Sequence, residues 1–260
     1  MTPEERHLKK AAAKAIGLLD LTNLNEDCTA ADIEDLCRRA VTPHGKVAAI
    51  CIWKEHIPQA KALLRDSGIR IATVVNFPHG GTDVDTVLAE TRQAIADGAD
   101  EIDLVLPYRA LIAGAGGVAT YMVKAVRKVC GRKALLKVIL ETGELGDEKL
   151  IRRASRLAID AGADFIKTST GKVAVNATPE TAEIMLKVIR KHGSRHKTGF
   201  KPAGGIRTTA DAVAYLDLAR NIMGKNWAKP RTMRFGASGV LADLMATLDG
   251  AESEKPGGGY

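Results

Sequence analysis

The sequence is poor in aromatic residues: Phe, Trp and Tyr make up only 4% of its 260 residues. Proteins that bind single-stranded nucleic acid stack bases on aromatic side chains, so this scarcity argues against a base-stacking platform despite a net charge of +7. The 38 Lys and Arg residues are dispersed along the chain rather than gathered in blocks. Since such a positive field suits a small anionic substrate equally well, we expect no nucleic-acid partner.

Long apolar runs and cysteine motifs are missing too. No stretch approaches the roughly 18 apolar residues that a transmembrane helix needs, and the charged, amphipathic N-terminal segment does not resemble a signal peptide. We therefore expect no membrane partner. The four cysteines show no C-x-x-C spacing and no dense framework, which is typical of reduced thiols. These absences predict a cytoplasmic protein.

The sequence does have a regular alternation of short apolar runs with helix-compatible stretches. The runs predict eight strands, at 16–21, 47–53, 70–76, 101–105, 135–140, 164–168, 198–201 and 234–236. Helices are predicted after them, at 31–39, 58–66, 84–97, 118–129, 147–161, 179–191, 209–218 and 241–248, and one more precedes the first strand at 3–15. Eight β/α units of roughly 30 residues predict a single (β/α)8 TIM barrel.

A doubly wound open sheet is the alternative α/β architecture. It usually carries a glycine fingerprint directly after an early strand, whereas the glycine-rich segment 114–117 follows a loop. We therefore assign 1–251 to one barrel domain. Residues 252–260 are polar and glycine-rich, and are predicted to form a flexible C-terminal tail.

Strand parity places charged side chains on the inner face of the predicted barrel. Side chains alternate between the two faces of a strand, and the face that packs against helices must be apolar. Because Ile102 and Leu104 take the helix side, Asp103 points inward. The same alternation directs one lysine inward from each of the next three strands: Lys137, Lys167 and Lys201.

This set of buried lysines has two interpretations, because lysines are rarely buried without partners. One is a salt-bridge network without chemistry. The other is covalent catalysis: two neighbouring ammonium groups disfavour each other's charge, so that one amine is partly neutral and can form a Schiff base with a carbonyl. Asp103 would then move protons or orient water. One acid cannot neutralise three lysines, which favours the catalytic interpretation.

Glycine-rich loops follow the last three predicted strands. Glycine lets backbone N–H groups approach an anion, and the carboxyl ends of late TIM-barrel strands commonly bind phosphate. One such loop is weak evidence, but three at corresponding positions predict a phosphorylated substrate. The candidate phosphate-binding residues are Thr170, Gly171, Lys172, Gly204, Gly205, Gly236, Ser238 and Gly239.

Two segments resemble signatures of a known family. The runs DFIKTSTG at 164–171 and GFKPAGG at 199–205 are similar to those of the 2-deoxyribose-5-phosphate aldolases, which are class I aldolases. The similarity extends over nearly the whole chain, from about 18 to 248. It implies reversible cleavage of 2-deoxy-D-ribose 5-phosphate to D-glyceraldehyde 3-phosphate and acetaldehyde, in deoxyribonucleoside catabolism. It also implies a homodimer that needs no metal or other cofactor.

The resemblance further implies roles for individual residues. Lys167 would form the Schiff base, Lys201 would be the neighbouring ammonium that activates it, and Asp103 would transfer protons. Tyr260 matches a C-terminal tyrosine that the family uses as a proton shuttle. The resemblance adds three positions to the substrate-binding set, Asp20, Thr22 and Cys51, and the inward-facing Lys137 is assigned to the same set. Close relatives often carry a serine where this chain has Gly239, so one hydroxyl contact to phosphate is missing here.

Three other functions stay open at this point. A class II aldolase needs a cluster of metal ligands, but the six histidines are dispersed along the sequence, so we expect no metal site. A basic nucleic-acid- or phosphate-binding protein would leave the inward lysines unexplained. Another Schiff-base enzyme, such as a transaldolase-like sugar-phosphate lyase, is the nearest chemical alternative.

Overall fold

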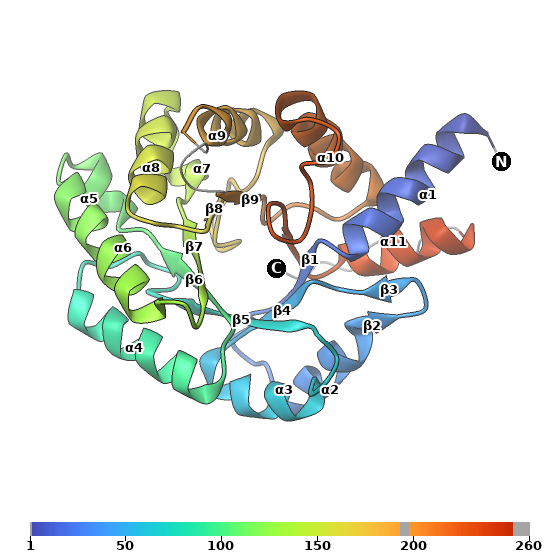
Figure 1. Cartoon of the computed structure of the whole chain (residues 1–260), viewed down its shortest axis with the longest axis horizontal. Helices are drawn as coiled ribbons and strands as arrows, with labels where there is room; N and C mark the ends of the chain where they lie inside the picture. Colours follow the sequence, from blue (N-terminus) through green and yellow to red (C-terminus); the bar gives the residue numbers. More distant parts are fainter. Residues whose placement is uncertain (1, 193–197, 252–260) are drawn as a thin grey trace.

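The computed structural model describes residues 2–192 and 198–251. Within them, eight parallel strands form one sheet in the order β10-β1-β4-β5-β6-β7-β8-β9, with helices around it (Figure 1). Backbone bonds also join β9 to the segment just before β10, because the Phe200 N–H donates to the Thr232 carbonyl at 2.8 Å and the Arg234 N–H to the Phe200 carbonyl at 3.0 Å. The predicted TIM barrel is confirmed. Its strands are β1 (Leu19–Asn23), β4 (Ala49–Ile52), β5 (Arg70–Val75), β6 (Glu101–Val105), β7 (Leu135–Ile139), β8 (Phe165–Lys167), β9 (Gly199–Lys201) and β10 (Phe235–Ala237).

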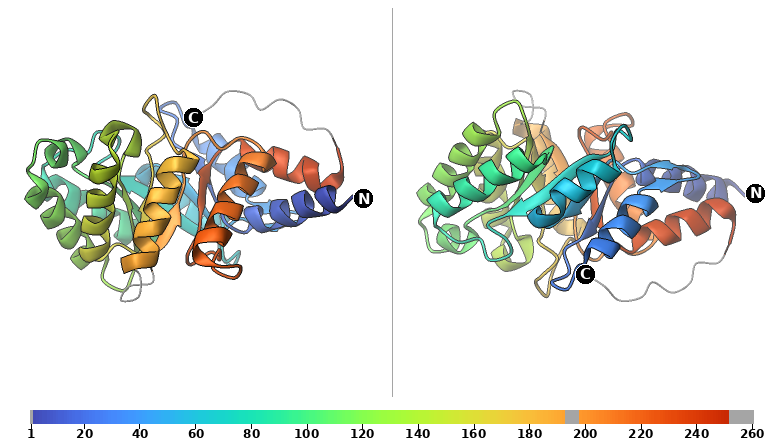
Figure 2. Two further views of the ribbon diagram at one scale, coloured as in Figure 1. Left: turned by 90° about the horizontal axis from the view of Figure 1, so that it is seen from above. Right: turned by 90° about the horizontal axis from the view of Figure 1, so that it is seen from below.

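Helices cover the outside of the barrel. Several begin at a capping box, in which a threonine side chain and the residue three positions later bond each other's backbone N–H, as at Thr2, Thr29 and Thr208. The N-terminal helix lies beside the last one (Figure 2). The helices are α1 (Pro3–Ile16), α2 (Ala30–Arg39), α3 (Ile57–Leu63), α4 (Val84–Asp97), α5 (Tyr108–Ile112), α6 (Gly116–Cys130), α7 (Thr142–Leu145), α8 (Glu148–Asp160), α9 (Pro179–His192), α10 (Thr209–Met223) and α11 (Val240–Asp249).

Several elements differ from the prediction in their boundaries, and some short ones were not predicted. The first strand begins at Leu19 rather than at residue 16, because α1 continues to Ile16 and ends at Gly17. The prediction also missed the hairpin of β2 (Val41–Thr42) and β3 (Gly45–Lys46). It missed the short helices α5 and α7 and the 3-10 turn η1 (Lys54–His56) as well. These elements are too short to show a period in the sequence.

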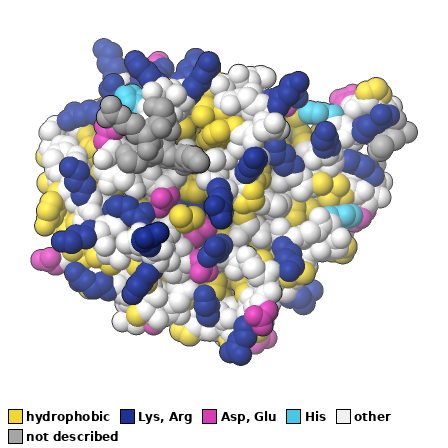
Figure 3. Space-filling view, viewed as in Figure 1, with side chains coloured by type: hydrophobic (Ala, Val, Ile, Leu, Met, Phe, Trp, Pro, Cys, Tyr) yellow, Lys and Arg dark blue, Asp and Glu magenta, His cyan; other side chains and the backbone are white. Residues whose placement is uncertain are grey.

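The outer surface carries dispersed charge. Figure 3 shows Lys and Arg side chains scattered over one face of the molecule, with Asp and Glu among them. Among the described residues, no helix is long and apolar enough to cross a membrane. In that part of the chain no three His, Cys, Asp or Glu side chains are grouped so that they could hold a metal ion.

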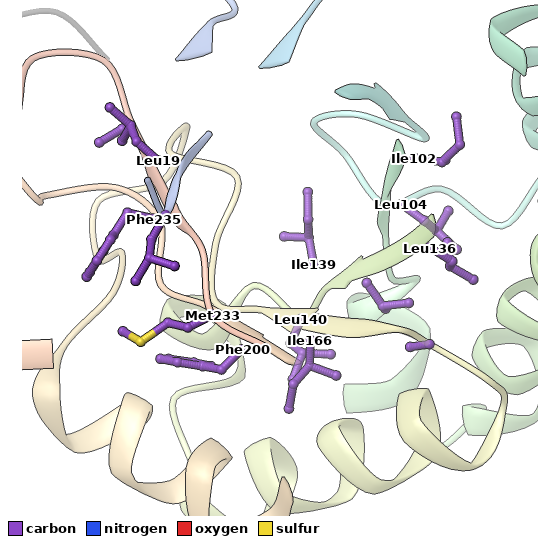
Figure 4. Packing of buried hydrophobic residues seen from close by; sticks show 14 of the residues in the cluster. Leu19, Ile102, Leu104, Leu136, Ile139, Leu140, Ile166, Phe200, Met233 and Phe235 are labelled. Atoms are coloured by element: carbon purple, nitrogen blue, oxygen red, sulfur yellow. The ribbon is translucent and has the colours of Figure 1, made fainter. Parts of the chain in front are cut away.

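The apolar core lies between the strands and the surrounding helices. Leu104, Leu136, Ile166 and Phe200 are fully buried there, on successive strands (Figure 4). These residues have the strand parity that the sequence assigned to the helix side. The opposite parity is therefore left for the barrel interior, where the charged residues lie.

The barrel interior is also tightly packed, which gives a test of the fold. A Cβ atom added at Gly199 of β9 would come within 2.4 Å of the Phe165 ring on β8. We expect Gly199→Ala to lower the free energy of unfolding by about 1–3 kcal/mol, the usual cost of overpacking. Urea denaturation measures this, with Gly117→Ala in α6 as the control, because a Cβ there meets no atom within 4 Å. Equal stability of the two variants would contradict the packing described.

Candidate active site

Inward-facing side chains from several strands form a buried network of charges. Asp103 Oδ1 lies 2.7 Å from Lys137 Nζ, and Asp103 Oδ2 lies 2.8 Å from Lys201 Nζ. Lys201 Nζ also donates to Asp20 Oδ2 at 2.6 Å. None of these four side chains is exposed to solvent, so the inward direction that parity predicts for Asp103, Lys137 and Lys201 is confirmed. Asp20 lies with them, although parity was not used to predict its direction.

Two further residues complete the network. Arg234 Nη1 donates to Asp20 Oδ1 at 2.6 Å, and Arg234 Nη2 donates to Glu101 Oε1 at 2.8 Å. Glu101 Oε2 lies 2.6 Å from Lys137 Nζ. Acids and bases therefore alternate around a closed ring, which we call the charge ring: Asp20, Lys201, Asp103, Lys137, Glu101 and Arg234.

The structure places more carboxylates inside the barrel than the sequence analysis expected. The expectation that one acid faces three lysines is wrong, because Asp20 and Glu101 also point inward. Glu101 has the same strand parity as Asp103. Arg234 could have been found in the same way, since Phe235 packs outward against α10 and its neighbour must therefore face inward.

Lys167 lies beside the charge ring rather than in it. Its Nζ is 3.1 Å from Asp103 Oδ2, the oxygen that Lys201 already binds at 2.8 Å. Lys137, by contrast, has three carboxylates within 3.3 Å, and Lys201 has two within 2.8 Å. Of the three buried lysines, Lys167 therefore has the fewest carboxylates close to its nitrogen. Its Nζ and that of Lys201 lie near the same Asp103 oxygen.

The network fixes the charge states of several members. Burial alone raises the pKa of Asp103, but the three surrounding lysines outweigh it and hold this pKa well below its usual value. Burial likewise raises the pKa of Asp20, and the neighbouring cations, led by Lys201, lower it overall. Burial lowers the pKa of Lys137, but three carboxylates raise it well above its usual value. Asp103 is consequently a carboxylate at neutral pH.

Thr22 and Cys51 lie next to each other on β1 and β4, where they are paired in register. The Thr22 hydroxyl donates to the Asp20 carbonyl at 2.8 Å. Cys51 is fully buried, and burial raises the pKa of its thiol. The structure therefore brings both candidate residues to the inside of the barrel, with Cys51 as a protonated and weakly nucleophilic thiol.

The predicted phosphate loops meet at the carboxyl ends of the last three strands. The Ala203 N–H donates to the Thr168 hydroxyl at 3.0 Å, and Ala203 forms a bridge with Gly236. The Gly204 N–H donates to the Gly236 carbonyl at 3.3 Å. Gly205 is exposed, with no atom within 4 Å of a Cβ placed there. These contacts bring the loops after β8, β9 and β10 side by side.

The loops after β8 and β10 add further groups to this end of the barrel. Gly171 has a left-handed backbone with φ of 88°, and Lys172 beside it is exposed. Ser238 leads to Gly239, which is the N-cap residue of α11 and contributes no side-chain cap. The first N–H groups of a helix have no partners within the helix, so this end of α11 attracts anions.

Glu141 is not among the residues predicted for the site. It is fully buried and has a φ of 58°, a region that non-glycine residues rarely occupy. Its Oε2 accepts from the Thr170 hydroxyl at 2.6 Å and its Oε1 from the Thr170 N–H at 3.1 Å. Burial raises the pKa of its carboxyl. Both donors of Thr170 are thus engaged by Glu141, which anchors the loop after β8.

Tyr260, the remaining predicted site residue, lies outside the described residues.

A closed parallel barrel with a lysine, a carboxylate and a second lysine at its centre has the architecture of a TIM-barrel aldolase. The model of the DeoC/LacD aldolase family matches residues 14–246, and the chain belongs to this family. The resemblance noted in the sequence is thereby confirmed.

Individual relatives agree with this family. The chain is 60% identical over 261 residues to a deoxyribose-phosphate aldolase from Agrobacterium fabrum, and the match covers 100% of both chains. A solved structure from Toxoplasma gondii ME49, assigned as a deoxyribose-phosphate aldolase, is 25% identical with a TM-score of 0.85, and covers 96% of this chain and 98% of that one. A tetrameric deoxyribose phosphate aldolase from Aeropyrum pernix is 23% identical with a TM-score of 0.75, over 93% and 97% of the chains, and shows the fold alone.

Proposed function

We propose that the protein is a deoxyribose-phosphate aldolase that acts through a Schiff base on Lys167. It would cleave 2-deoxy-D-ribose 5-phosphate reversibly to D-glyceraldehyde 3-phosphate and acetaldehyde, in the breakdown of deoxyribonucleosides. The 60% identity to the Agrobacterium fabrum aldolase supports this substrate. The observation that carries the proposal is the position of Lys167, whose Nζ shares one Asp103 oxygen with Lys201.

The proposed reaction begins at the aldehyde carbon of the open-chain sugar. The neutral Lys167 amine attacks this carbon to give a carbinolamine, whose hydroxyl takes up a proton and leaves as water, so that a protonated imine remains. The imine draws in the electron pair of the bond between C2 and C3, while the C3 hydroxyl loses its proton and becomes the aldehyde of the three-carbon product. The resulting enamine takes up a proton at C2. Water then hydrolyses the imine, which releases acetaldehyde and restores the amine.

Asp103 and Lys201 are suited to move the protons of this sequence. The low pKa of Asp103 keeps its carboxylate ionised in the resting protein, where it binds the ammonium groups with which it would exchange protons. Lys201 binds the same oxygen at 2.8 Å, so a proton can pass between the two groups without either moving far. A role for Tyr260 as a further proton shuttle stays a prediction, as does a substrate contact of Thr22 or Cys51.

We place the substrate phosphate where the three glycine-rich loops meet. The exposed Gly205, the exposed Lys172 and the first turn of α11 offer N–H groups and positive charge there. The donors of Thr170 and Gly204 already bond other residues, so we assign these two residues to shaping the loops. Ser238 would add a hydroxyl beside the start of α11.

A homodimer and a cytoplasmic location belong to the same proposal. The family resemblance supports the dimer, while the Aeropyrum pernix relative is described as a tetramer. Light scattering of the purified protein separates a dimer from a monomer and a tetramer.

The direct test of the proposed function is a product assay. We expect 2-deoxy-D-ribose 5-phosphate to give acetaldehyde and D-glyceraldehyde 3-phosphate in equal amounts, at a rate that EDTA does not change. Coupled dehydrogenase assays measure both aldehydes. Loss of activity with EDTA would favour a class II aldolase. Transfer of a carbon unit without release of acetaldehyde would favour a transaldolase-like enzyme, and no product at all would favour a binding protein.

A further inference from the structure

We propose that Glu101 and Arg234 are positioning residues that set the charge of Lys167 through the charge ring. Neither residue forms an ion pair with Lys167 among the described contacts, and both are linked to it only through other members of the ring. The inference deepens the proposed function and rests on it, because it concerns the amine that would form the Schiff base.

The first argument is the balance of charge. The ring holds three carboxylates and three cations, and each carboxylate bonds a cation on either side. Lys167 adds a seventh charge without a carboxylate of its own, since Asp103 Oδ2 is already bound by Lys201. The ring is therefore neutral by itself, and a protonated Lys167 adds a positive charge next to it, with the Asp103 carboxylate already shared.

The second argument concerns the other groups near Lys167. Cys51 on β4, Asp103 on β6 and Glu141 directly after β7 interact with it electrostatically, and Lys137 on β7 and Lys201 on β9 bind the same Asp103 carboxylate. Burial keeps Cys51 protonated, and Glu141 is bonded to Thr170. Asp103 and Lys137 keep their charges, because their pKa values lie far from neutrality in the favourable directions. A change of charge in the ring therefore acts on Lys167.

The third argument is that Glu101 and Arg234 are held too firmly to act as reactants. Arg234 donates to the Pro230 carbonyl at 2.5 Å in addition to its two carboxylates, and its guanidinium lies 5.7 Å from the centre of the Phe165 ring. Its side chain is 4% exposed and that of Glu101 is 1% exposed. Because buried charges are poorly screened by water and salt, their field acts on Lys167 without contact.

The test uses two substitutions that change the ring charge in opposite directions. Glu101→Gln removes a negative charge, so the positive excess grows and Lys167 loses its proton more readily. Arg234→Gln removes a positive charge, so Lys167 keeps its proton more firmly. The measurement is the pH at which reductive trapping of acetaldehyde on Lys167 by cyanoborohydride reaches half its maximal rate. We expect this midpoint to fall by about one pH unit in the first variant and to rise by about as much in the second.

Three controls separate this effect from general damage. The double variant Glu101→Gln with Arg234→Gln should return the midpoint to the wild-type value, because the two charge changes cancel. Glu101→Asp and Arg234→Lys keep the charge, so they should keep the midpoint even if they lower stability in urea. If one Gln variant does not fold, the pH midpoints of the other Gln variant and of the double variant are compared with that of the wild type instead.

The outcomes distinguish this inference from the proposed function. Shifts of the same sign in both Gln variants, or no shift in folded variants, would overturn the role of Glu101 and Arg234. A shifted midpoint in the charge-keeping variants would point to geometry rather than charge and would also overturn it. If wild-type protein gains no acetaldehyde adduct on Lys167 at any pH, the proposed function itself fails.

Discussion

Replacing Lys167 with leucine is expected to abolish both turnover and covalent trapping of acetaldehyde. The leucine side chain fills a similar volume but has no amine to form an imine, so no electron sink is available when the carbon–carbon bond breaks. We expect kcat to fall by at least about 10⁴-fold, as it does when an enzymatic nucleophile is removed. The product assay gives kcat, and mass spectrometry after treatment with acetaldehyde and borohydride shows whether a reduced two-carbon group has been added.

A lysine on the loop that follows β8 provides the matched control for this experiment. Lys172 is exposed and lies five residues after Lys167, outside the charge ring. Lys172→Leu should still gain the adduct on Lys167, because acetaldehyde carries no phosphate that would need Lys172. If Lys167→Leu still gained one reduced two-carbon group on an active-site peptide, another amine such as that of Lys201 would be the nucleophile, and the assignment would be wrong.

The inward position of the central residues could be predicted because it depends on local alternation alone. Ile102 and Leu104 determine the direction of Asp103, and apolar neighbours on β7 and β8 do the same for Lys137 and Lys167. The barrel itself followed from counting such strands. Both predictions need only the alternation of apolar and polar residues within a few positions of each side chain.

The number of partners around each lysine could not be predicted in this way. Arg234 and Asp20 are 214 residues apart in the sequence, and they meet only because the barrel brings β10 beside β1. Glu141 and Thr170 are 29 residues apart and meet through two loops whose backbone shape no periodicity describes. The pairing of these side chains is therefore a property of the closed barrel, whereas the inward direction of Glu101 follows from the same local alternation as that of Asp103, so the sequence already contained a second inward acid.

Replacing Asp103 with asparagine is expected to lower activity and stability together. Asp103 binds Lys137, Lys167 and Lys201 at once, and asparagine keeps its shape without its charge. Removal of one partner from a buried ion pair usually costs about 3–5 kcal/mol of unfolding free energy. Loss of a group that moves protons lowers kcat by roughly 10²- to 10⁴-fold. Urea unfolding and the product assay at neutral pH measure the two effects.

The dependence of this stability loss on pH identifies the carboxylate as its cause. Because the pKa of Asp103 is held well below that of a free aspartate, its stabilisation is complete above about pH 4 and is lost as the pH falls through the folded-state pKa. The difference in unfolding free energy between wild type and Asp103→Asn should thus be constant between about pH 5 and 8 and shrink in more acidic solution.

Asp83→Asn is the matched control for this change. Asp83 caps α4 by accepting from the Thr86 N–H, and asparagine caps a helix about as well, so the variant should lose little stability. A difference for Asp103→Asn that grew on acidification would contradict a stabilising carboxylate. Lost activity with unchanged stability would mean that Asp103 acts only on the substrate. Loss of both is expected because the carboxylate that binds the three lysines is also the one that we propose to transfer protons during the reaction.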